Sequence, residues 1–301
     1  MKNLIICTFV FLFSITIVLN ILIMIRITNL VKNPLKNITT FALIIPIHPK
    51  HYHYIYDLIR IIDINLDLFL VFTNQNEYES FERQDRVKKI VIPEITTGNI
   101  VTFKKYFALE QLKNTNYKYF IVCDAEITIV PENFNEKNIF SKINKIFKNK
   151  IIYAGETNDE NINSITKNSV DLIIDKEQKL EKITKNYKLY FWWSDLPVYK
   201  KDHLTHFFSV INYNNLTWYH FDHVIYTSYL LLYQKFNIVN ITPILNIHWS
   251  LESYNTLDID NLHKLQSNKY GFSFITKQLY DNHKEFLQQE GCFLLYHLDR
   301  Q

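Results

Sequence analysis

Residues 117–131 read YKYFIVCDAEITIVP, and in this stretch an apolar run leads directly into two carboxylates, Asp124 and Glu126. The run up to Cys123 is typical of a buried strand, and the chain becomes apolar again after Glu126. Burying an unpaired carboxylate is costly, so such groups are usually paired, bound to a metal, or placed at a strand end that faces a ligand. The neighbouring segments help to choose between these cases.

The segments before this stretch alternate between strand and helix patterns. Apolar runs at 41–47, 66–74 and 87–94 predict strands, whereas 54–64 and 101–114 carry apolar residues at helical spacing. The order β-α-β-β-α-β predicts an α/β domain with a mixed, mostly parallel sheet flanked by helices. Ligands of such sheets bind beyond the carboxyl ends of the strands, so we expect the two carboxylates to face a ligand.

The second half of the chain continues with less regular patterns. We expect an amphipathic helix over 135–150 with its lysines in solvent, a strand at 151–155, and a variable or mobile insertion over 156–188 that contains a short strand, VDLII. A helix is predicted over 218–236 and a strand over 236–242. Two amphipathic pieces with no clear chemistry follow in the tail.

An apolar segment precedes the α/β domain. Residues 4–25 are uncharged and almost wholly apolar, and about 20 such residues cross a bilayer. Since no small-residue cleavage site is obvious, we expect an uncleaved anchor over 1–26, a polar tether over 27–40 and one soluble domain over 41–301. The protein is then a single-pass membrane protein, of the Golgi or secretory pathway in a eukaryote and of the inner membrane otherwise. Basic residues flank both ends of the segment, so its orientation stays open.

Composition excludes several classes of site. The chain has only 4 glycines, so neither a Walker loop nor a GxGxxG loop is present. The net charge of +3 gives no argument for a nucleic-acid partner. The three cysteines fit no zinc spacing and are too few for a disulfide framework.

The Asp124-Ala125-Glu126 triplet offers hard oxygen ligands. Such ligands suit Mn²⁺ or Mg²⁺, which keep open positions for phosphate oxygens, although metal independence is an alternative. We expect His248 as a third ligand, because imidazole is acceptable to Mn²⁺. A salt bridge with nearby lysines would equally explain the carboxylates, and a hydrogen-bonded histidine packed by Trp249 would explain His248.

The strand FALIIPI, the helix KKYFALEQL and the acidic stretch YFIVCDAEI together resemble the GT-A glycosyltransferases, over roughly residues 40–250. That resemblance implies a Rossmann-like sheet in which a D-x-D or related triplet ends a central strand and binds a metal and a nucleotide-sugar donor. Here the triplet ends in Glu. It further implies that Pro46, Ile47 and His48 line the nucleotide base. Lys104 or Lys105 would meet a phosphate or the sugar, although we favour a solvated helix face for both lysines.

Further roles follow for the aromatic and acidic residues downstream. Trp192, Trp193 and Asp195 combine flat rings with a carboxylate, which suits an acceptor sugar, although a tryptophan pair in the core is an equal alternative. Asp222 opens a helix, where an N-cap is the commonest role of Asp. By the resemblance, Asp222 first and Asp195 second are candidates for the catalytic base that deprotonates the acceptor hydroxyl.

These features predict a membrane-anchored glycosyltransferase that moves a sugar from a nucleotide-sugar donor to a glycan, glycoprotein or glycolipid acceptor. A nucleotidyltransferase uses a similar sheet, but its usual Gly-rich loop is missing from PIHPKHYHY. A non-catalytic, membrane-tethered carbohydrate-binding protein would explain the anchor and the aromatic residues. It would not require two carboxylates at a strand end.

Overall fold

The computed structural model describes residues 40–64, 66–82, 84–174, 189–190, 196–245, 258–267 and 273–299. All of them belong to one compact unit, Thr40–Gln301. The expected anchor at 1–26 lies outside the described residues. In the part of the chain that is described, no helix has the length and apolar character needed to cross a membrane.

Five strands form the main sheet, in the order β3-β2-β1-β4-β8. Four of them run parallel to one another, β1 (Phe41–Pro46), β2 (Asp67–Phe72), β3 (Val87–Val91) and β4 (Tyr119–Val122), whereas β8 (Val198–Lys200) is antiparallel to β4. The predicted mixed, mostly parallel α/β sheet is therefore confirmed. Its central strand β1 and the two strands beside it, β2 and β4, are buried almost along their whole length, because helices cover both faces.

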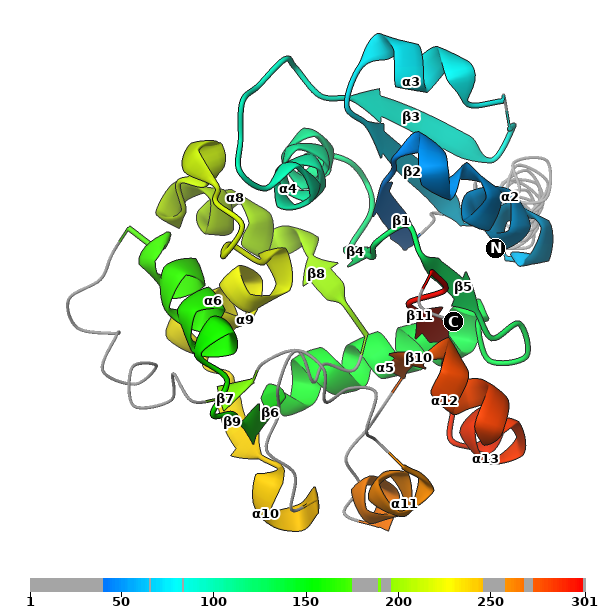
Figure 1. Cartoon of the computed structure of the whole chain (residues 1–301), viewed down its shortest axis with the longest axis vertical. Coiled ribbons are helices and arrows are strands. Elements are labelled where there is room, and N and C mark those ends of the chain that lie inside the picture. Colours follow the sequence, from blue (N-terminus) through cyan, green and yellow to red (C-terminus); the bar gives the residue numbers. More distant parts are fainter. Residues whose placement is uncertain are drawn as a thin grey trace, which may run out of the picture. The chain divides into compact units, whose positions relative to one another are not determined.

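Helices on opposite faces of this sheet enclose two cores (Figure 1). On one face, η1 (Pro49–His51) leads into α2 (Tyr52–Ile61), which packs with α5 (Glu136–Asn149). The other face is covered by α4 (Ile100–Leu112), α8 (Lys201–Val210) and α9 (Asp222–Tyr233). The short helix α3 (Gln75–Ser80) lies between β2 and β3, and η2 (Tyr213–Asn215) connects α8 to α9.

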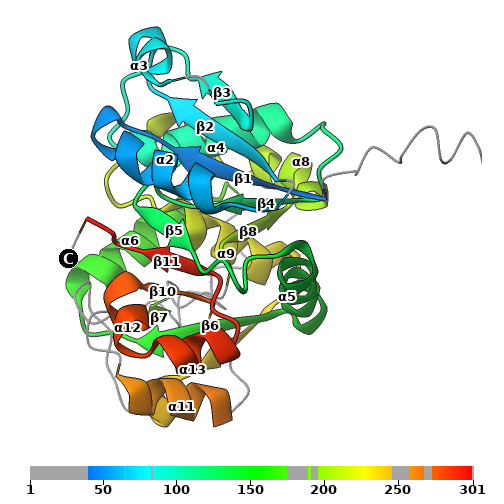
Figure 2. The ribbon, with the colours of Figure 1, turned by 90° about the vertical axis from the view of Figure 1, so that its right-hand side faces the viewer.

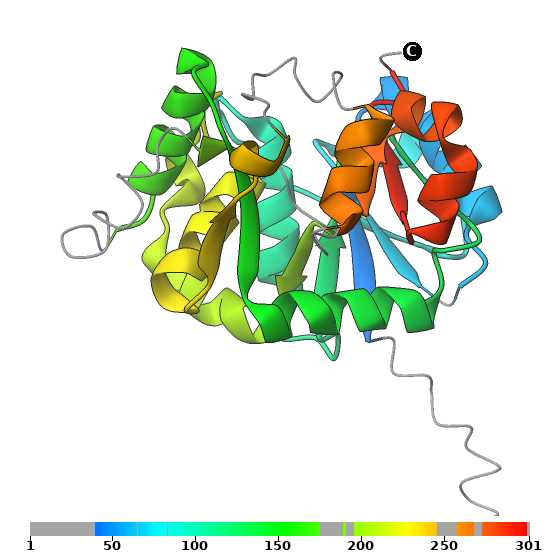
Figure 3. The same cartoon turned by 90° about the horizontal axis from the view of Figure 1, so that it is seen from below.

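Two smaller sheets complete the unit. Strand β6 (Ile151–Glu156) lies between β7 (Leu189–Tyr190) and β9 (Asn237–Asn240), and the long helix α5 connects it to β5 (Ile127–Ile129), as Figure 3 shows. Strand β11 (Leu294–Tyr296) lies between β10 (Phe274–Thr276) and β5. Apart from α6, described below, the remaining helices of the described residues are α10 (Thr242–Leu245), α11 (Ile259–Ser267), α12 (Lys277–Asn282) and α13 (Lys284–Gln289).

The C-terminal tail thus packs beside residues 117–131, the stretch that contains the two carboxylates. Strand β5 directly follows the acidic triplet, and β11 pairs with it antiparallel, with Tyr296 opposite Ile127 (Figure 2). The tail carries two strands as well as its helices, so its description as two amphipathic pieces was incomplete. The register brings the last described residues beside Glu126, whose carbonyl accepts a hydrogen bond from the Leu298 amide at 3.3 Å.

The expected strand VDLII within 156–188 is wrong. Helix α6 (Glu160–Asp171) occupies this region, and Ile173 makes only an isolated bridge to Ile211. Asp159 caps the helix by accepting hydrogen bonds from the amides of Asn161 and Ile162. Apolar side chains at helical spacing then bury one face of α6, which a polar composition had concealed.

Candidate active site

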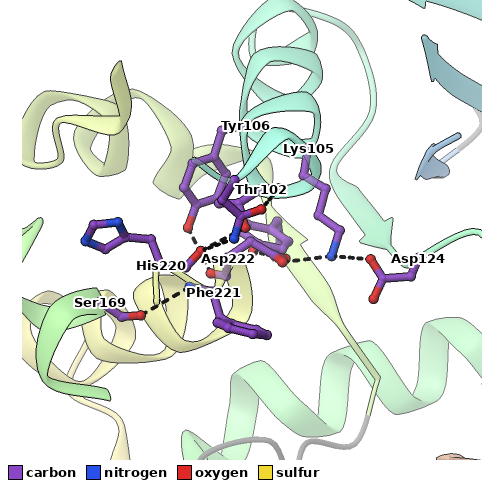
Figure 4. Close-up of polar contacts among 10 residues, drawn as sticks. Thr102, Lys105, Tyr106, Asp124, Ser169, His220, Phe221 and Asp222 are labelled. Carbon is purple, nitrogen blue, oxygen red and sulfur yellow. Dashed lines mark hydrogen bonds and ion pairs between the residues drawn. The ribbon is translucent and has the colours of Figure 1, made fainter. Parts of the chain in front are cut away.

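Asp124 and Asp222 lie on either side of one lysine at the carboxyl end of β4 (Figure 4). The Lys105 Nζ atom is 2.9 Å from Asp124 Oδ1 and 2.7 Å from Asp222 Oδ1. The side chains of Lys105 and Asp222 are each only 6% exposed, whereas that of Asp124 is 60% exposed. The cluster therefore presents one carboxylate to solvent and keeps its other two charges inside the protein.

Helix α4 explains why the lysine is buried. The helix packs against the sheet on one side and against α8 and α9 on another, so eight of its residues, including Lys104 and Lys105, are buried. The expectation of a solvated lysine face is therefore wrong. Both lysines can be buried because each ammonium has partners within the protein. Lys105 forms ion pairs with two aspartates, and Lys104 donates a hydrogen bond to the Ile47 carbonyl at 2.6 Å.

Burial and neighbouring charges shift the pKa values of Lys105 and Asp124 in opposite directions. Burial would lower the pKa of Lys105, but the carboxylates of Asp124 and Asp222 raise it above its usual range, so this side chain is a permanent cation. Its surroundings would raise the pKa of Asp124, but the Lys105 ammonium lowers it below the usual value. Asp124 is consequently an ionised, accessible carboxylate at neutral pH.

Asp222 is the first residue of α9, and Phe221 occupies the N-cap position without a side-chain cap. The N-cap interpretation of Asp222 is therefore wrong. Its Oδ1 accepts from Lys105, its Oδ2 accepts from the Tyr199 hydroxyl at 3.1 Å, and its carbonyl accepts from the Tyr106 hydroxyl at 2.9 Å. A negative charge here is also stabilised by the dipole of the helix N-terminus.

Glu126 points to a different set of partners. His51 Nε2 is 3.4 Å from Glu126 Oε1, and His51, Glu126 and Asp299 each offer one ligand atom within 4.8 Å of the others. Asp299 reaches this place because β11 pairs with β5, as described above. Asp124 is not part of this group, so within the described residues the two carboxylates of the triplet do not share one set of ligand atoms.

This second group suits a divalent cation. Ligand atoms lie about 2.0–2.6 Å from such ions, so two ligands of one ion are at most about 5 Å apart. Burial lowers the pKa of His51, so the imidazole is neutral at pH 7, as metal coordination requires. Burial and the Asp124 charge raise the pKa of Glu126 above its usual value. One nitrogen and two oxygens favour Mn²⁺ over Mg²⁺.

The residues expected to line a nucleotide base are placed unequally. Pro46 and Ile47 are buried, Ile47 being 1% exposed with its side chain in the core, so neither side chain can line a ligand. That part of the expectation is wrong, because burial continues from β1 through Ile47, one residue beyond the end of the strand. His48 is exposed at the same strand end. Ala125, the middle residue of the triplet, is 2% exposed and packs in the core.

Lys104 is buried next to the end of β1, where it donates to the Ile47 carbonyl. Burial lowers the pKa of Lys104 to about 8, against the opposing effect of Glu77, whose carboxylate lies 3.9 Å away. Four expected site residues lie outside the described residues, namely Trp192, Trp193, Asp195 and His248.

Sequence reasoning missed His51, Asp299 and the bridging role of Lys105. His51 had a signal, since three histidines follow the first predicted strand at 48, 51 and 53. Asp299 had none, because only the pairing of β11 with β5 brings it to the triplet.

No family model matches the chain, and no curated protein matches it. Among solved structures, it is similar to a protein from Desulfovibrio desulfuricans G20 assigned as a nucleotide-diphospho-sugar transferase, with 7% identity over 77% of this chain and 98% of the other, and a TM-score of 0.34. It is also similar to residues 1–349 of TarS from S. aureus, with 11% identity over 75% of this chain and 68% of the other, and a TM-score of 0.36. The same TarS fragment in complex with UDP-GlcNAc matches with 13% identity over 67% of this chain and 55% of the other, and a TM-score of 0.33. Similarity this distant assigns no function.

Proposed function

We propose that this protein is a glycosyltransferase that uses a nucleotide-sugar donor and a divalent cation. One observation carries the proposal: an ionised, exposed Asp124 is fixed by a buried Lys105 at the carboxyl end of β4, next to the cation-binding group of His51, Glu126 and Asp299. Ligands of parallel α/β sheets bind at this edge. A diphosphate there needs positive charge, and a bound cation would supply it.

The chain's own residues take the following roles in this proposal. His51, Glu126 and Asp299 would hold the cation, and a cation bound there would offset charge on the diphosphate both in the donor and in the leaving group. Asp124 accepts hydrogen bonds from donor hydroxyls, and Lys105 keeps it ionised and oriented. The exposed His48 contacts the nucleotide, while Lys104 supports the same edge by binding the Ile47 carbonyl.

The transfer step needs a proton acceptor. As the acceptor hydroxyl attacks the anomeric carbon, its oxygen forms the new glycosidic bond, the bond to the nucleoside diphosphate breaks, and the hydroxyl proton passes to a base. Both carboxylate oxygens of the buried Asp222 are already engaged by Lys105 and Tyr199, so we assign Asp222 to position Lys105. Asp195 is then the proposed base, on the sequence argument given above.

Three further parts of the proposal rest on sequence alone. Residues 1–26 anchor the domain in a membrane, which suits a glycoprotein or glycolipid acceptor that is itself at a membrane. Trp192 and Trp193 contribute to acceptor binding. His248 would add a ligand to the cation.

Release of nucleoside diphosphate from a panel of sugar nucleotides tests the proposal. The whole 301-residue chain should turn over one or a few donors with Mn²⁺, and Asp124→Asn should lower kcat/KM at least about 100-fold, roughly 2.7 kcal/mol. The matched control is Asp202→Asn, since Asp202 is likewise exposed and paired with a lysine, at 3.7 Å from Lys200. Equal activity of wild type and Asp124→Asn would contradict the role of Asp124. Pyrophosphate release from a nucleoside triphosphate and a sugar phosphate would instead identify a nucleotidyltransferase.

A further inference from the structure

An exposed group of aromatic rings precedes Asp222 on the segment that enters α9. Trp218 is 59% exposed and Tyr219 is 41% exposed, and their rings are nearly parallel, with centroids 6.4 Å apart and 11° between the planes. The Trp218 ring also contacts Phe221, with centroids 5.0 Å apart. We call Trp218, Tyr219 and Phe221 the aromatic platform.

The backbone of the platform is held from two sides. Thr102 and Asn99, at the start of α4, donate hydrogen bonds to the His220 carbonyl, both at 2.9 Å. On the α6 side, the Ser169 hydroxyl donates to the Tyr219 carbonyl at 3.2 Å. It also accepts a hydrogen bond from the Phe221 amide at 3.2 Å (Figure 4). Large rings that face solvent from a fixed backbone form a preorganised contact surface.

The segment that carries the platform is polar but has no charged side chain of its own, whereas Asp171, at the end of α6, is close enough to His220 to influence its pKa. Residues 211–221, INYNNLTWYHF, contain no Lys, Arg, Asp or Glu. Exposed amide and hydroxyl side chains flank the rings instead, at Asn212, Asn214, Asn215 and Thr217. Rings with neutral hydrogen-bonding groups match a sugar, which has an apolar C–H face and a hydroxyl rim. An anionic lipid surface or a nucleic acid would require basic residues here.

The rings continue from the platform towards the charged cluster. The Phe221 ring lies 6.1 Å from that of His223, centroid to centroid. His223 lines a largely apolar cavity of about 80 Å³ together with Tyr199, which donates to Asp222. His223 is also close enough to Asp124 and Asp222 for both carboxylates to influence its pKa. The half-buried His223 thus connects the platform with the charged cluster.

We propose that the aromatic platform binds a neutral pyranose of the acceptor glycan, with the reacting hydroxyl directed along Phe221 and His223 towards Asp124. This inference rests on the proposed function, because a glycosyltransferase needs an acceptor-binding surface in addition to its donor site. It names the acceptor class as an uncharged glycan and places its binding surface between α4, α6 and α9.

A glycan array tests this inference, with immobilised mono- and oligosaccharides and the whole chain as analyte. The variants are Trp218→Ala and the conservative Trp218→Phe, and the matched control is Phe140→Ala, which removes a ring 41% exposed on α5. We expect wild type, Trp218→Phe and Phe140→Ala to bind the same glycans, and Trp218→Ala to bind them at least tenfold more weakly. The Mn²⁺-dependent thermal shift with sugar nucleotides should be equal in all four proteins.

The outcomes separate this inference from the proposed function. Glycan binding that survives in Trp218→Ala, or a silent array, overturns the platform, and a nucleotide-dependent thermal shift in the same proteins would leave the transferase standing. Glycan binding that needs Trp218 in a protein without any nucleotide response supports the platform and overturns the transferase. Loss of binding to phosphatidylserine vesicles in Trp218→Ala, without glycan binding in wild type, would assign the surface to a membrane.

Discussion

At the scale of single residues, the site depends on the two ion pairs that Lys105 forms. Its ammonium is buried and is shared between Asp124, which is exposed, and Asp222, which is not. Removing one partner of a buried ion pair leaves an uncompensated charge, which is far more destabilising than losing an exposed pair. The consequences for stability should therefore come mainly through Asp222.

Lys105→Met should destabilise the protein by about 3–5 kcal/mol, because the buried Asp222 carboxylate keeps only its bond from Tyr199. Urea unfolding measures the loss. In the double variant Lys105→Met, Asp222→Asn, no buried charge remains, so its destabilisation should be smaller than the sum of the two single effects. A loss below about 1 kcal/mol in Lys105→Met would contradict the pairing.

Asp222→Asn separates a positioning residue from a catalytic base. We expect a loss of stability, since the buried Lys105 loses a charged partner, together with weaker donor binding measured as a higher KM. A base would instead lower kcat by at least about 100-fold with KM and stability unchanged. The two outcomes are distinguished by steady-state kinetics and urea unfolding of the same preparation.

The buried His203 should make stability depend on pH. Burial lowers the pKa of His203 to about 4 in the folded protein, whereas an unfolded histidine has a pKa of about 6.5. Between these values the unfolded chain binds a proton that the folded protein does not, so stability falls as the pH is lowered from about 6.5 to 4, by up to about 3 kcal/mol. His203→Gln should flatten this part of the profile, and the exposed His53→Gln should not. Identical profiles for wild type and His203→Gln would contradict the assignment.

At the scale of elements, the sequence predicted helices and strands correctly where buried apolar residues recur at regular spacing. The four parallel strands, α2, α4, α5 and α9 were predicted from apolar spacing, because these elements pack directly on the main sheet. The helix α6 was not, since its polar composition concealed an Asp159 cap and an apolar stripe. Lys104 and Lys105 were assigned to solvent because charged residues usually are, and only the packing of α4 between the sheet and α8 and α9 shows otherwise.

The start of α4 fixes the aromatic platform through Gly98. A Cβ atom at this position would lie 2.9 Å from the Leu216 carbonyl oxygen and 3.0 Å from the Thr217 Cα, so the segment leading to Trp218 would have to move. Gly98→Ala should cost about 1–3 kcal/mol in urea unfolding and weaken glycan binding at least tenfold.

Gly291→Ala is the control for that effect. Gly291 has φ +78° and open space around a Cβ, so the substitution strains the backbone far from the platform. It should lower stability and leave glycan binding unchanged. If both glycine variants bind glycans like wild type, the position of the platform does not depend on the contact at Gly98.

At the scale of the whole molecule, the last strand completes the candidate cation site. Its position could not be predicted from sequence, because β5 and β11 lie more than 160 residues apart and each has only 3 residues. Phe293, Leu294 and Leu295 are each at most 5% exposed, so β11 contributes substantially to the core as well as to the site.

Two truncations separate these contributions. Removing residues 299–301 should leave the unfolding midpoint nearly unchanged and weaken Mn²⁺ binding at least tenfold in a calorimetric titration, because Asp299 is lost. Removing residues 292–301 also deletes four buried core side chains, of which Phe293, Leu294 and Leu295 each contribute about 1.5–3 kcal/mol. Their sum is comparable with the whole stability of a typical domain. Unchanged Mn²⁺ affinity in the shorter truncation would contradict the role of Asp299.

The central claim, a cation-dependent nucleotide-sugar site at Asp124 and Glu126, is tested most directly by thermal unfolding of the whole chain. Sugar nucleotides and nucleoside diphosphates are added with and without Mn²⁺, since a ligand that binds only the folded state raises the melting temperature. We predict that one nucleotide raises it only with Mn²⁺, and that Asp124→Asn and Glu126→Gln lose this shift while Asp202→Asn keeps it. No shift with any nucleotide, with or without Mn²⁺, would contradict the account.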